Sequence, residues 1–201
     1  MAQDCVGDRV GDRARKILGD RVRRNLEKEE KAEELLEANG LGFLAHRVHL
    51  AFDPYQIAQN MVEYKKRLEE RLKPYLSKIR SVAFQKADNR RTFIYISRDL
   101  LPNDFMESDA AVIEMPYEDF YQKYKAKFIY LDKYRRPAFS ALASKYYGFA
   151  KNYKVVLLRD HNVDQEIAAT LSPNIYPIST HEDKPVYVGY ALFIPEGGAN
   201  A

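Results

Sequence analysis

The stretch at residues 117–154, YEDFYQKYKAKFIYLDKYRRPAFSALASKYYGFAKNYK, decides how we interpret the rest of the chain. It holds eight of the 15 tyrosines, and its nine Lys or Arg against three acids give it a net charge of +6 in a chain of net charge +3. Aromatic residues recur in it at steps of three and four, the spacing of one helix face. Pro137 interrupts the pattern, because the residue before a proline is pushed out of the helical region. We therefore predict two aromatic-rich helices, over about 117–131 and 137–152.

This stretch has two interpretations. In the first, the rings form a core and the lysines are a solvated face. In the second, some tyrosines are exposed among the basic residues, where they stack on nucleic-acid bases or anchor a protein partner. The candidate nucleic-acid-binding residues are Lys123, Lys127, Tyr130, Arg135, Arg136, Lys145 and Lys151.

Residues 1–39 are predicted to form a charged helical arm. Residues 8–24 carry seven bases and three acids, whereas residues 27–37 carry six acids and two bases. Bases near the start of a helix and acids near its end oppose the helix dipole, so helix stability does not favour this order. A partner with the complementary pattern does favour it, and a second copy running antiparallel has that pattern. The candidate partner-binding residues are Arg13, Arg21, Arg24, Glu30 and Glu34.

Glycines recur in the arm, at Gly7, Gly11 and Gly19. Each costs a helix about 1 kcal/mol relative to alanine. They indicate either close approach by the backbone of a partner or an arm that is no stable helix when free. Asn39-Gly40 is a helix stop signal.

The remaining residues, 40–201, are predicted to form one globular domain. Asp53-Pro54 starts a long helix with a coiled-coil-like seam, which Pro74 kinks or ends. Residues 81–88 and 91–98 alternate as in a β-hairpin, and strands are expected at 155–158 and 185–194. The fold class is therefore α+β, with long N-terminal helices, a β-hairpin and a mostly antiparallel sheet covered by an aromatic-rich helical pair.

Motifs that carry chemistry are weak in this sequence. It contains no glycine-rich phosphate loop, no HExxH and no GxSxG. The single cysteine, Cys5, excludes an internal disulfide and a cysteine-based zinc cluster. Asp160-His161, followed by Asp164 and Glu166, clusters acids with a histidine, an arrangement that can host a general base or a metal but more often opens a helix. We expect no cofactor.

These observations favour a non-enzymatic structural or interaction subunit of a larger protein assembly, a virus or phage particle being one candidate. Its partners are then other protein subunits, either copies of itself or foreign. The alternatives are a nucleic-acid-binding protein that uses residues 117–154 and an enzyme with an unrecognised site. The longest apolar run, about nine residues, is too short to span a membrane. The first residues lack the apolar core of a secretory signal. We therefore expect a soluble protein inside a cell or virion.

Overall fold

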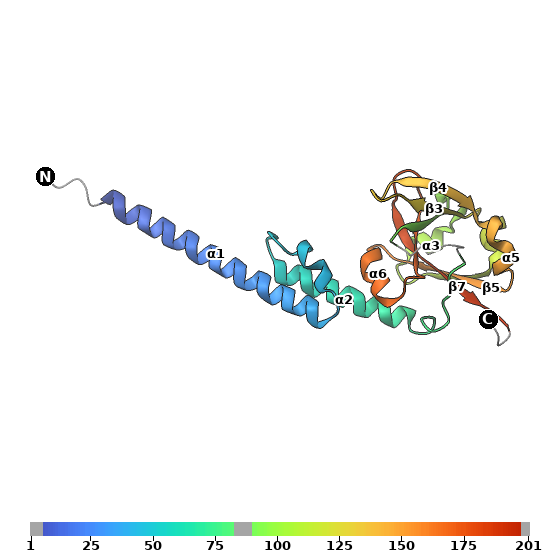
Figure 1. Ribbon diagram of the computed structural model, residues 1–201, viewed down its shortest axis with the longest axis horizontal. Helices are drawn as coiled ribbons and strands as arrows, with labels where there is room; N and C mark the ends of the chain where they lie inside the picture. Colours follow the sequence, from blue (N-terminus) through green and yellow to red (C-terminus); the bar gives the residue numbers. More distant parts are fainter. Residues whose placement is uncertain (1–5, 83–89, 198–201) are drawn as a thin grey trace. The chain divides into compact units, whose positions relative to one another are not determined.

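The computed structural model describes residues 6–82 and 90–197, with side chains from residue 12 onward (Figure 1). The chain divides into two compact units, residues 1–67 and 68–201. The prediction for Cys5, and most of the strand predicted at 81–88, lie outside the described residues. The sequence predicts a boundary at residue 39, between a separate arm and a globular domain. That boundary stays a prediction.

The first unit contains α1 (Val6–Ala38), η1 (Gly42–Arg47) and most of α2 (Pro54–Leu72). The predicted helix signals are confirmed. Gly40 ends α1 with φ +71°, and the backbone N–H of Leu41 donates to the carbonyl of Leu36 at 2.8 Å. This is the left-handed cap that glycine favours. Asp53 caps α2 through Oδ1, which accepts from the N–H of Gln56 at 3.2 Å.

The second unit is built on a seven-stranded sheet, counted over the described residues, with the order β2-β5-β7-β6-β1-β3-β4. The strands are β1 (Thr92–Tyr95), β2 (Val112–Pro116), β3 (Lys127–Leu131), β4 (Pro137–Leu142), β5 (Tyr153–Arg159), β6 (Tyr176–Ser179) and β7 (Tyr187–Pro195). The helices are η2 (Arg98–Leu100), α3 (Asn103–Glu107), α4 (Tyr117–Gln122), η3 (Ala143–Tyr146), α5 (Tyr147–Ala150) and α6 (Gln165–Leu171). Of the strand pairs, β1–β6 is parallel and the rest are antiparallel. The predicted α+β fold is confirmed.

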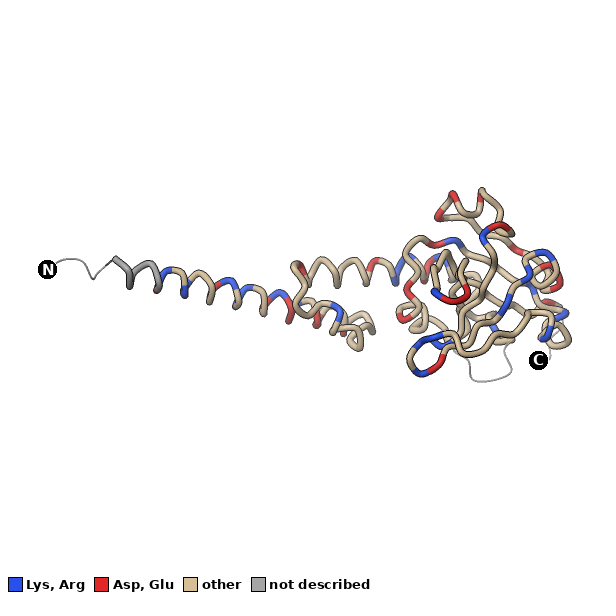
Figure 2. Tube along the Cα trace, turned by 90° about the horizontal axis from the view of Figure 1, so that it is seen from above, with Lys and Arg blue, Asp and Glu red and all other residues tan. Residues whose placement is uncertain are grey.

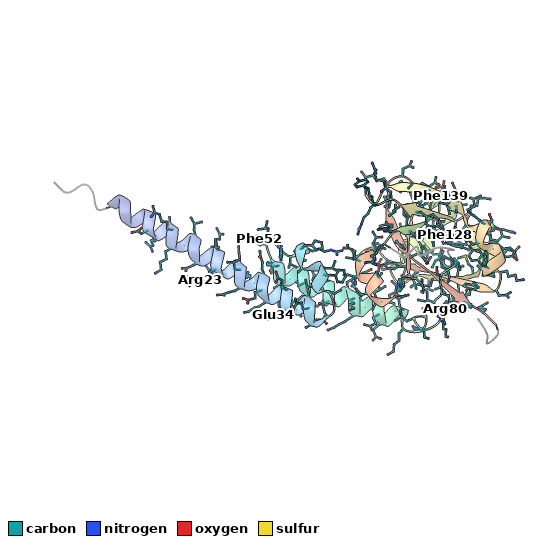
Figure 3. The ribbon with its side chains drawn as sticks, viewed as in Figure 1. Arg23, Glu34, Phe52, Arg80, Phe128 and Phe139 are labelled. Carbon is teal, nitrogen blue, oxygen red and sulfur yellow. The ribbon has the colours of Figure 1, made fainter. Side chains whose placement is uncertain are left out.

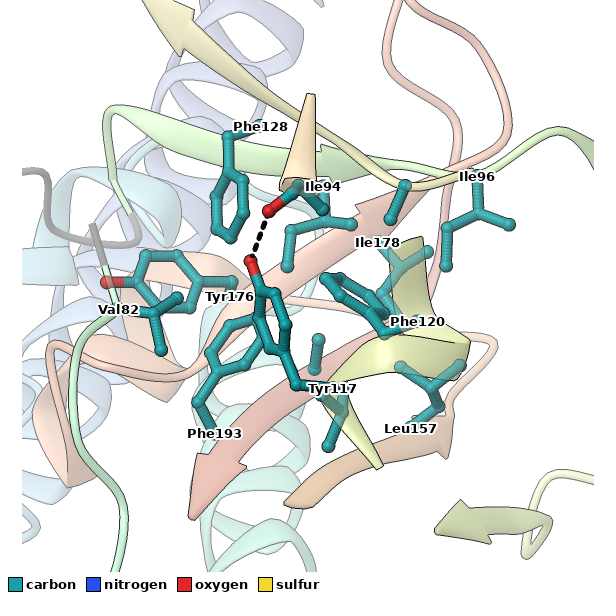
Figure 4. Close-up of a cluster of buried hydrophobic side chains, with 14 of the residues drawn as sticks. Val82, Ile94, Ile96, Tyr117, Phe120, Phe128, Leu157, Tyr176, Ile178 and Phe193 are labelled. Atoms are coloured by element: carbon teal, nitrogen blue, oxygen red, sulfur yellow. Dashed lines mark hydrogen bonds between the residues drawn. The ribbon is translucent and has the colours of Figure 1, made fainter. Parts of the chain in front are cut away.

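The core of this unit lies between one face of the sheet and the helices α4, η3 and α5. Phe128 and Phe193 from the sheet meet Tyr117 and Phe120 from α4 (Figure 4). The hydroxyl of Tyr117 donates to the carbonyl of Ala143 at 2.8 Å, so this buried polar group is satisfied. The aromatic-rich helical pair that covers the sheet is therefore present.

The two helices are much shorter than the sequence predicted, and β3 and β4 form a hairpin between them. Lys125 (φ +48°) follows α4 with a left-handed backbone, and Arg135 (φ +59°) closes the hairpin turn. There the side chain of Asp132 accepts from the N–H groups of Tyr134 and Arg136. Residues 128–131, Phe-Ile-Tyr-Leu, are apolar or aromatic on both faces, as in a strand buried on both sides. The helices predicted over about 117–131 and 137–152 were therefore wrong in their extent.

Of the hairpin predicted around Asp88-Asn89, the second strand forms β1, which pairs with β3 and with β6. Most of its first strand lies outside the described residues, so that hairpin stays a prediction. A hairpin that the structure does describe is β3–β4.

Candidate interaction surface on helix α1

The C-terminal part of α1 is covered by its own unit. Ala32 and Leu36 are fully buried, and the ammonium of Lys65 on α2 donates to the carbonyl of Asn39 at 2.7 Å. The loop after η1 lies against the same part of the helix. His49 Nε2 lies 2.6 Å from Oε1 of Glu33, and the N–H of Leu50 donates to Oε1 of Glu29 at 3.1 Å.

The loop after η1 is hydrogen-bonded to α1 at Glu29 and Glu33, and the described side chains of α1 before Glu29 are exposed. Leu18, Val22, Leu26, Glu29 and Glu33 follow one another at steps of four, four, three and four, so they share one face of α1. The loop reaches Glu29 and Glu33 but leaves the three apolar residues exposed. We call Leu18, Val22 and Leu26 the apolar strip. It continues a covered helix face into a segment where nothing in the described part of the chain covers it.

The loop that ends the cover is itself apolar at its tip. Leu50 is 96% exposed and Phe52 is 100% exposed. Figure 3 labels Phe52 beside the first unit's helices. Leu50 adopts φ +58°, a left-handed backbone that leucine seldom takes. Its N–H bond to Glu29 places this apolar ledge, Leu50 and Phe52, one helical turn from Leu26. Strip and ledge each expose apolar side chains, and exposed apolar surface of this kind can mark an interaction site.

Not every exposed apolar residue of α1 belongs to the strip. Ile17 is 56% exposed and Leu18 is 61% exposed. Adjacent residues on a helix do not face the same way, so Ile17 lies off the strip. The two residues therefore form a matched pair of similar exposure.

The predicted partner-binding residues are all exposed on α1, but none belongs to the strip: Arg13, Arg21, Arg24, Glu30 and Glu34. Arg21 and Glu30 flank it, being three residues from Leu18 and four from Leu26. Figure 2 shows the basic residues preceding the acidic ones along α1. The role of these five residues stays a prediction. Segment charge alone does not single out Arg15 and Glu29, which extend the strip at steps of three.

Most charges proposed to bind nucleic acid have partners in the chain. Lys123 pairs with Asp119, Lys127 with Glu182, Arg135 with Glu166 and Arg136 with Asp132, at 2.8 to 3.3 Å. Lys145 lies over the ring of Phe139 at 5.7 Å, and Lys151 is exposed. These acids offset much of the local positive charge. A role of these residues in nucleic-acid binding stays a prediction.

The rings that would stack on bases are largely inside the second unit. Tyr117 and Tyr146 are buried, and the Tyr130 hydroxyl lies 2.7 Å from that of Tyr146. Burial raises the pKa of Tyr117 and Tyr130 above the ordinary value of 10.0. Tyr134 remains exposed, beneath the cationic groups of Lys133 and Arg136. The geometry therefore favours the first interpretation of this stretch, a core with a solvated basic face.

The acid–histidine cluster has structural contacts. His161 pairs with Asp109, and the Asp164 carboxylate caps α6 by accepting from the N–H of Ile167 at 3.1 Å. Glu166 pairs with Arg135. In residues 12–82 and 90–197, no three His, Cys, Asp or Glu side chains gather as a metal site would require.

A cavity of about 250 Å³ lies beside β4, lined by Ile129, residues 137–140, Glu182 and Asp183. The Glu182 carboxylate is held by Lys127 at 2.8 Å. Ser140 is the hydroxyl that lines the cavity, and no histidine there can act as its base. The lining residues therefore contain no Ser–His pair.

No protein-family model matches the chain, and neither a curated protein nor a solved structure is significantly similar to it. Among the described helices, none combines the length and the apolar character that a membrane span needs.

Proposed function

We propose that this protein is a non-enzymatic interaction subunit, which assembles with other protein through the apolar strip of α1. The observation that carries the proposal is that Leu18, Val22 and Leu26 continue a helix face that the chain's own loop covers only from Glu29 onward. Single exposed apolar residues are normal on a protein surface. A row of them at helical spacing, in an otherwise charged arm, is the pattern of an amphipathic helix that lacks its partner.

The energetics of the arm support the same conclusion. A helix that projects without tertiary packing is marginal in water, and α1 also contains Gly7, Gly11 and Gly19. Full burial of a Val or Leu side chain contributes about 1.5–3 kcal/mol. The strip side chains are 58–61% exposed, because α1 itself shields the rest of each, so a partner adds roughly 1–2 kcal/mol per side chain. Three such contributions offset the cost of the three glycines, at about 1 kcal/mol each.

The test compares the insertion of charge on the strip with the insertion of charge beside it. Leu18→Asp combined with Val22→Asp places carboxylates on the strip, whereas Ile17→Asp places one beside it. We expect the first variant to lose any complex that the wild-type chain forms, and the second to keep it. The complex is measured as mass by analytical ultracentrifugation, for the purified chain and for material from an extract of the native source.

The proposal is contradicted if both variants retain the complex equally, since the strip would then have no role in it. Circular dichroism of each variant provides the folding control, because both substitutions place Asp in the interior of the same helix.

A further inference from the structure

The strip of α1 is symmetric about its middle residue. Arg15, Leu18, Val22, Leu26 and Glu29 follow at steps of three, four, four and three, so all five lie on one helix face. Reversing the direction of the helix about Val22 exchanges Leu18 with Leu26 and Arg15 with Glu29. The apolar positions thus repeat themselves on reversal, while the charges at the two ends change sign.

We propose that the occupant of the strip is a second copy of this chain, running antiparallel, with the two-fold axis at Val22. This rests on the proposed function of the strip as a protein contact. In this arrangement Val22 meets its own copy, and Leu18 of each chain meets Leu26 of the other. Arg15 of each chain lies opposite Glu29 of the other, which makes two pairs of opposite charge at the ends of the strip.

Charge decides between the two orientations of the copy. A parallel copy sets Arg15 against Arg15 and Glu29 against Glu29, which repel, although its apolar contacts are equally good. The antiparallel copy also brings residues 13–17, with net charge +3, opposite residues 27–31, with net charge −1. Arg21 and Arg23 are one residue from Val22, so they do not face the two-fold axis.

The loop after η1 holds the side chain of Glu29, which in the dimer lies opposite Arg15 of the copy. The carboxylate of Glu29 is fixed through Oε1 by the N–H of Leu50, and its other oxygen can accept from a guanidinium. The ledge of Leu50 and Phe52 lies at the same level of the helix. The segment of the copy around Arg15 and Leu18 therefore meets both a fixed acid and apolar surface.

A charge exchange tests the orientation in the full-length chain. Arg15→Glu alone and Glu29→Arg alone each create two like-charge pairs in the antiparallel dimer, so we expect the dimer dissociation constant to rise about tenfold. The double variant restores both pairs with reversed polarity but lacks the acceptor for the Leu50 N–H, so we expect its constant to be severalfold lower than that of Glu29→Arg alone. Arg23→Glu is the matched control off the strip. The constants come from sedimentation at about 1–200 μM, the range expected for a small interface.

Thiol cross-linking gives a second measurement that does not depend on the charges. In a Cys5→Ser background, Leu18→Cys and Leu26→Cys chains are prepared separately, then mixed and oxidised. We expect disulfides between position 18 of one chain and position 26 of the other, because the two positions lie opposite each other across the axis. Each chain oxidised alone joins slowly, because its thiols are held about 12 Å apart along the helix.

The outcomes separate this inference from the proposed function. Rapid joining of position 18 to position 18, or failure of the double charge variant to recover, overturns the antiparallel copy. A wild-type chain that stays monomeric, but binds a different protein through the strip, overturns self-association and leaves the proposed function standing. If the Leu18 and Val22 double variant keeps both the complex with its own copy and any complex with a different protein, the antiparallel copy and the proposed function are both overturned.

Discussion

At the scale of single residues, the hydroxyl of Tyr117 joins α4 to η3 inside the core. It donates to the carbonyl of Ala143, and the ring is fully buried. We expect Tyr117→Phe to lower the free energy of unfolding by about 1 kcal/mol, the usual net value of such a hydrogen bond. The matched control is Tyr134→Phe, at an exposed position, with a change below about 0.5 kcal/mol. Urea unfolding measures both, and equal effects would show that the buried bond is not stabilising.

The same residue links stability to alkaline pH. Burial raises the pKa of Tyr117, so its folded value lies above the ordinary value of 10.0. The unfolded chain therefore loses this proton first, and the stability that the neutral group provides is complete below pH 10 and is lost as the pH rises toward the folded pKa. The variant Tyr117→Phe lacks the group, so we expect its urea midpoint to fall less than that of wild type between about pH 8 and about pH 11.

Other residues have roles that the sequence does not reveal. Gly189 in β7 looks like a glycine that weakens a strand, but a Cβ there would lie 2.1 Å from the carbonyl oxygen of Leu158 on β5. The close approach of two strands depends on pairing across the sheet, which local sequence does not contain. Gly40 and Asp53 could be predicted, because a helix stop and a helix cap depend on a few adjacent residues.

At the scale of elements, the long N-terminal helices were predictable and the extent of the aromatic helices was not. The periodicity of α2 and the signals at its ends agree with one another. In residues 117–131, aromatic residues at steps of three and four occur both on α4 and on a strand buried on both faces. Periodicity cannot distinguish a short buried strand from a helix segment, so packing in the sheet decides. The apolar strip needed the structure as well, because only the reach of the loop shows where the helix becomes uncovered.

A prediction at this scale concerns Gly19 in helix α1. A Cβ at this position would meet nothing within 4 Å, and the residue is adjacent to Leu18, off the strip. We expect Gly19→Ala to stabilise the helix by about 1 kcal/mol and to raise the helical circular dichroism signal. The dimer should form at least as well, because a less frayed arm loses less freedom on association. Weaker association would mean that a partner backbone approaches the helix at Gly19, and the strip would then be misplaced.

At the scale of the whole molecule, the two units differ in what stabilises them. The second unit has its own aromatic core between sheet and helices. The first has a small buried set around Ala32, Leu36 and Leu44, and a long helix half that is exposed. Burial on a partner therefore matters far more to the first unit, since a small core leaves a domain marginal.

Because of this difference, we expect the melting temperature of the first unit to rise with chain concentration and that of the second unit to stay constant. Association stabilises the folded form by mass action, about 2.7 kcal/mol at a hundredfold excess over the dissociation constant. For a unit of this size that corresponds to a rise in Tm of roughly 10 °C or more. We expect the rise in the first unit between about 1 and about 200 μM chain. Far-ultraviolet circular dichroism is dominated by the long helices α1 and α2, of 33 and 19 residues, which lie wholly or mostly in the first unit. The near-ultraviolet tyrosine signal reports mainly the second unit, which contains 13 of the 15 tyrosines.

The Leu18 and Val22 double variant should remove the dependence, and Ile17→Asp should leave it, because only the first alters the strip. If the tyrosine signal shifted together with the helical signal, association would involve the second unit, and β4 at the edge of its sheet would be the surface to test. If neither signal moved with concentration, the exposed half of α1 would have to stay folded without a copy of itself. Its charged, glycine-containing sequence makes that outcome costly, which is why the helix and its partner are best measured together.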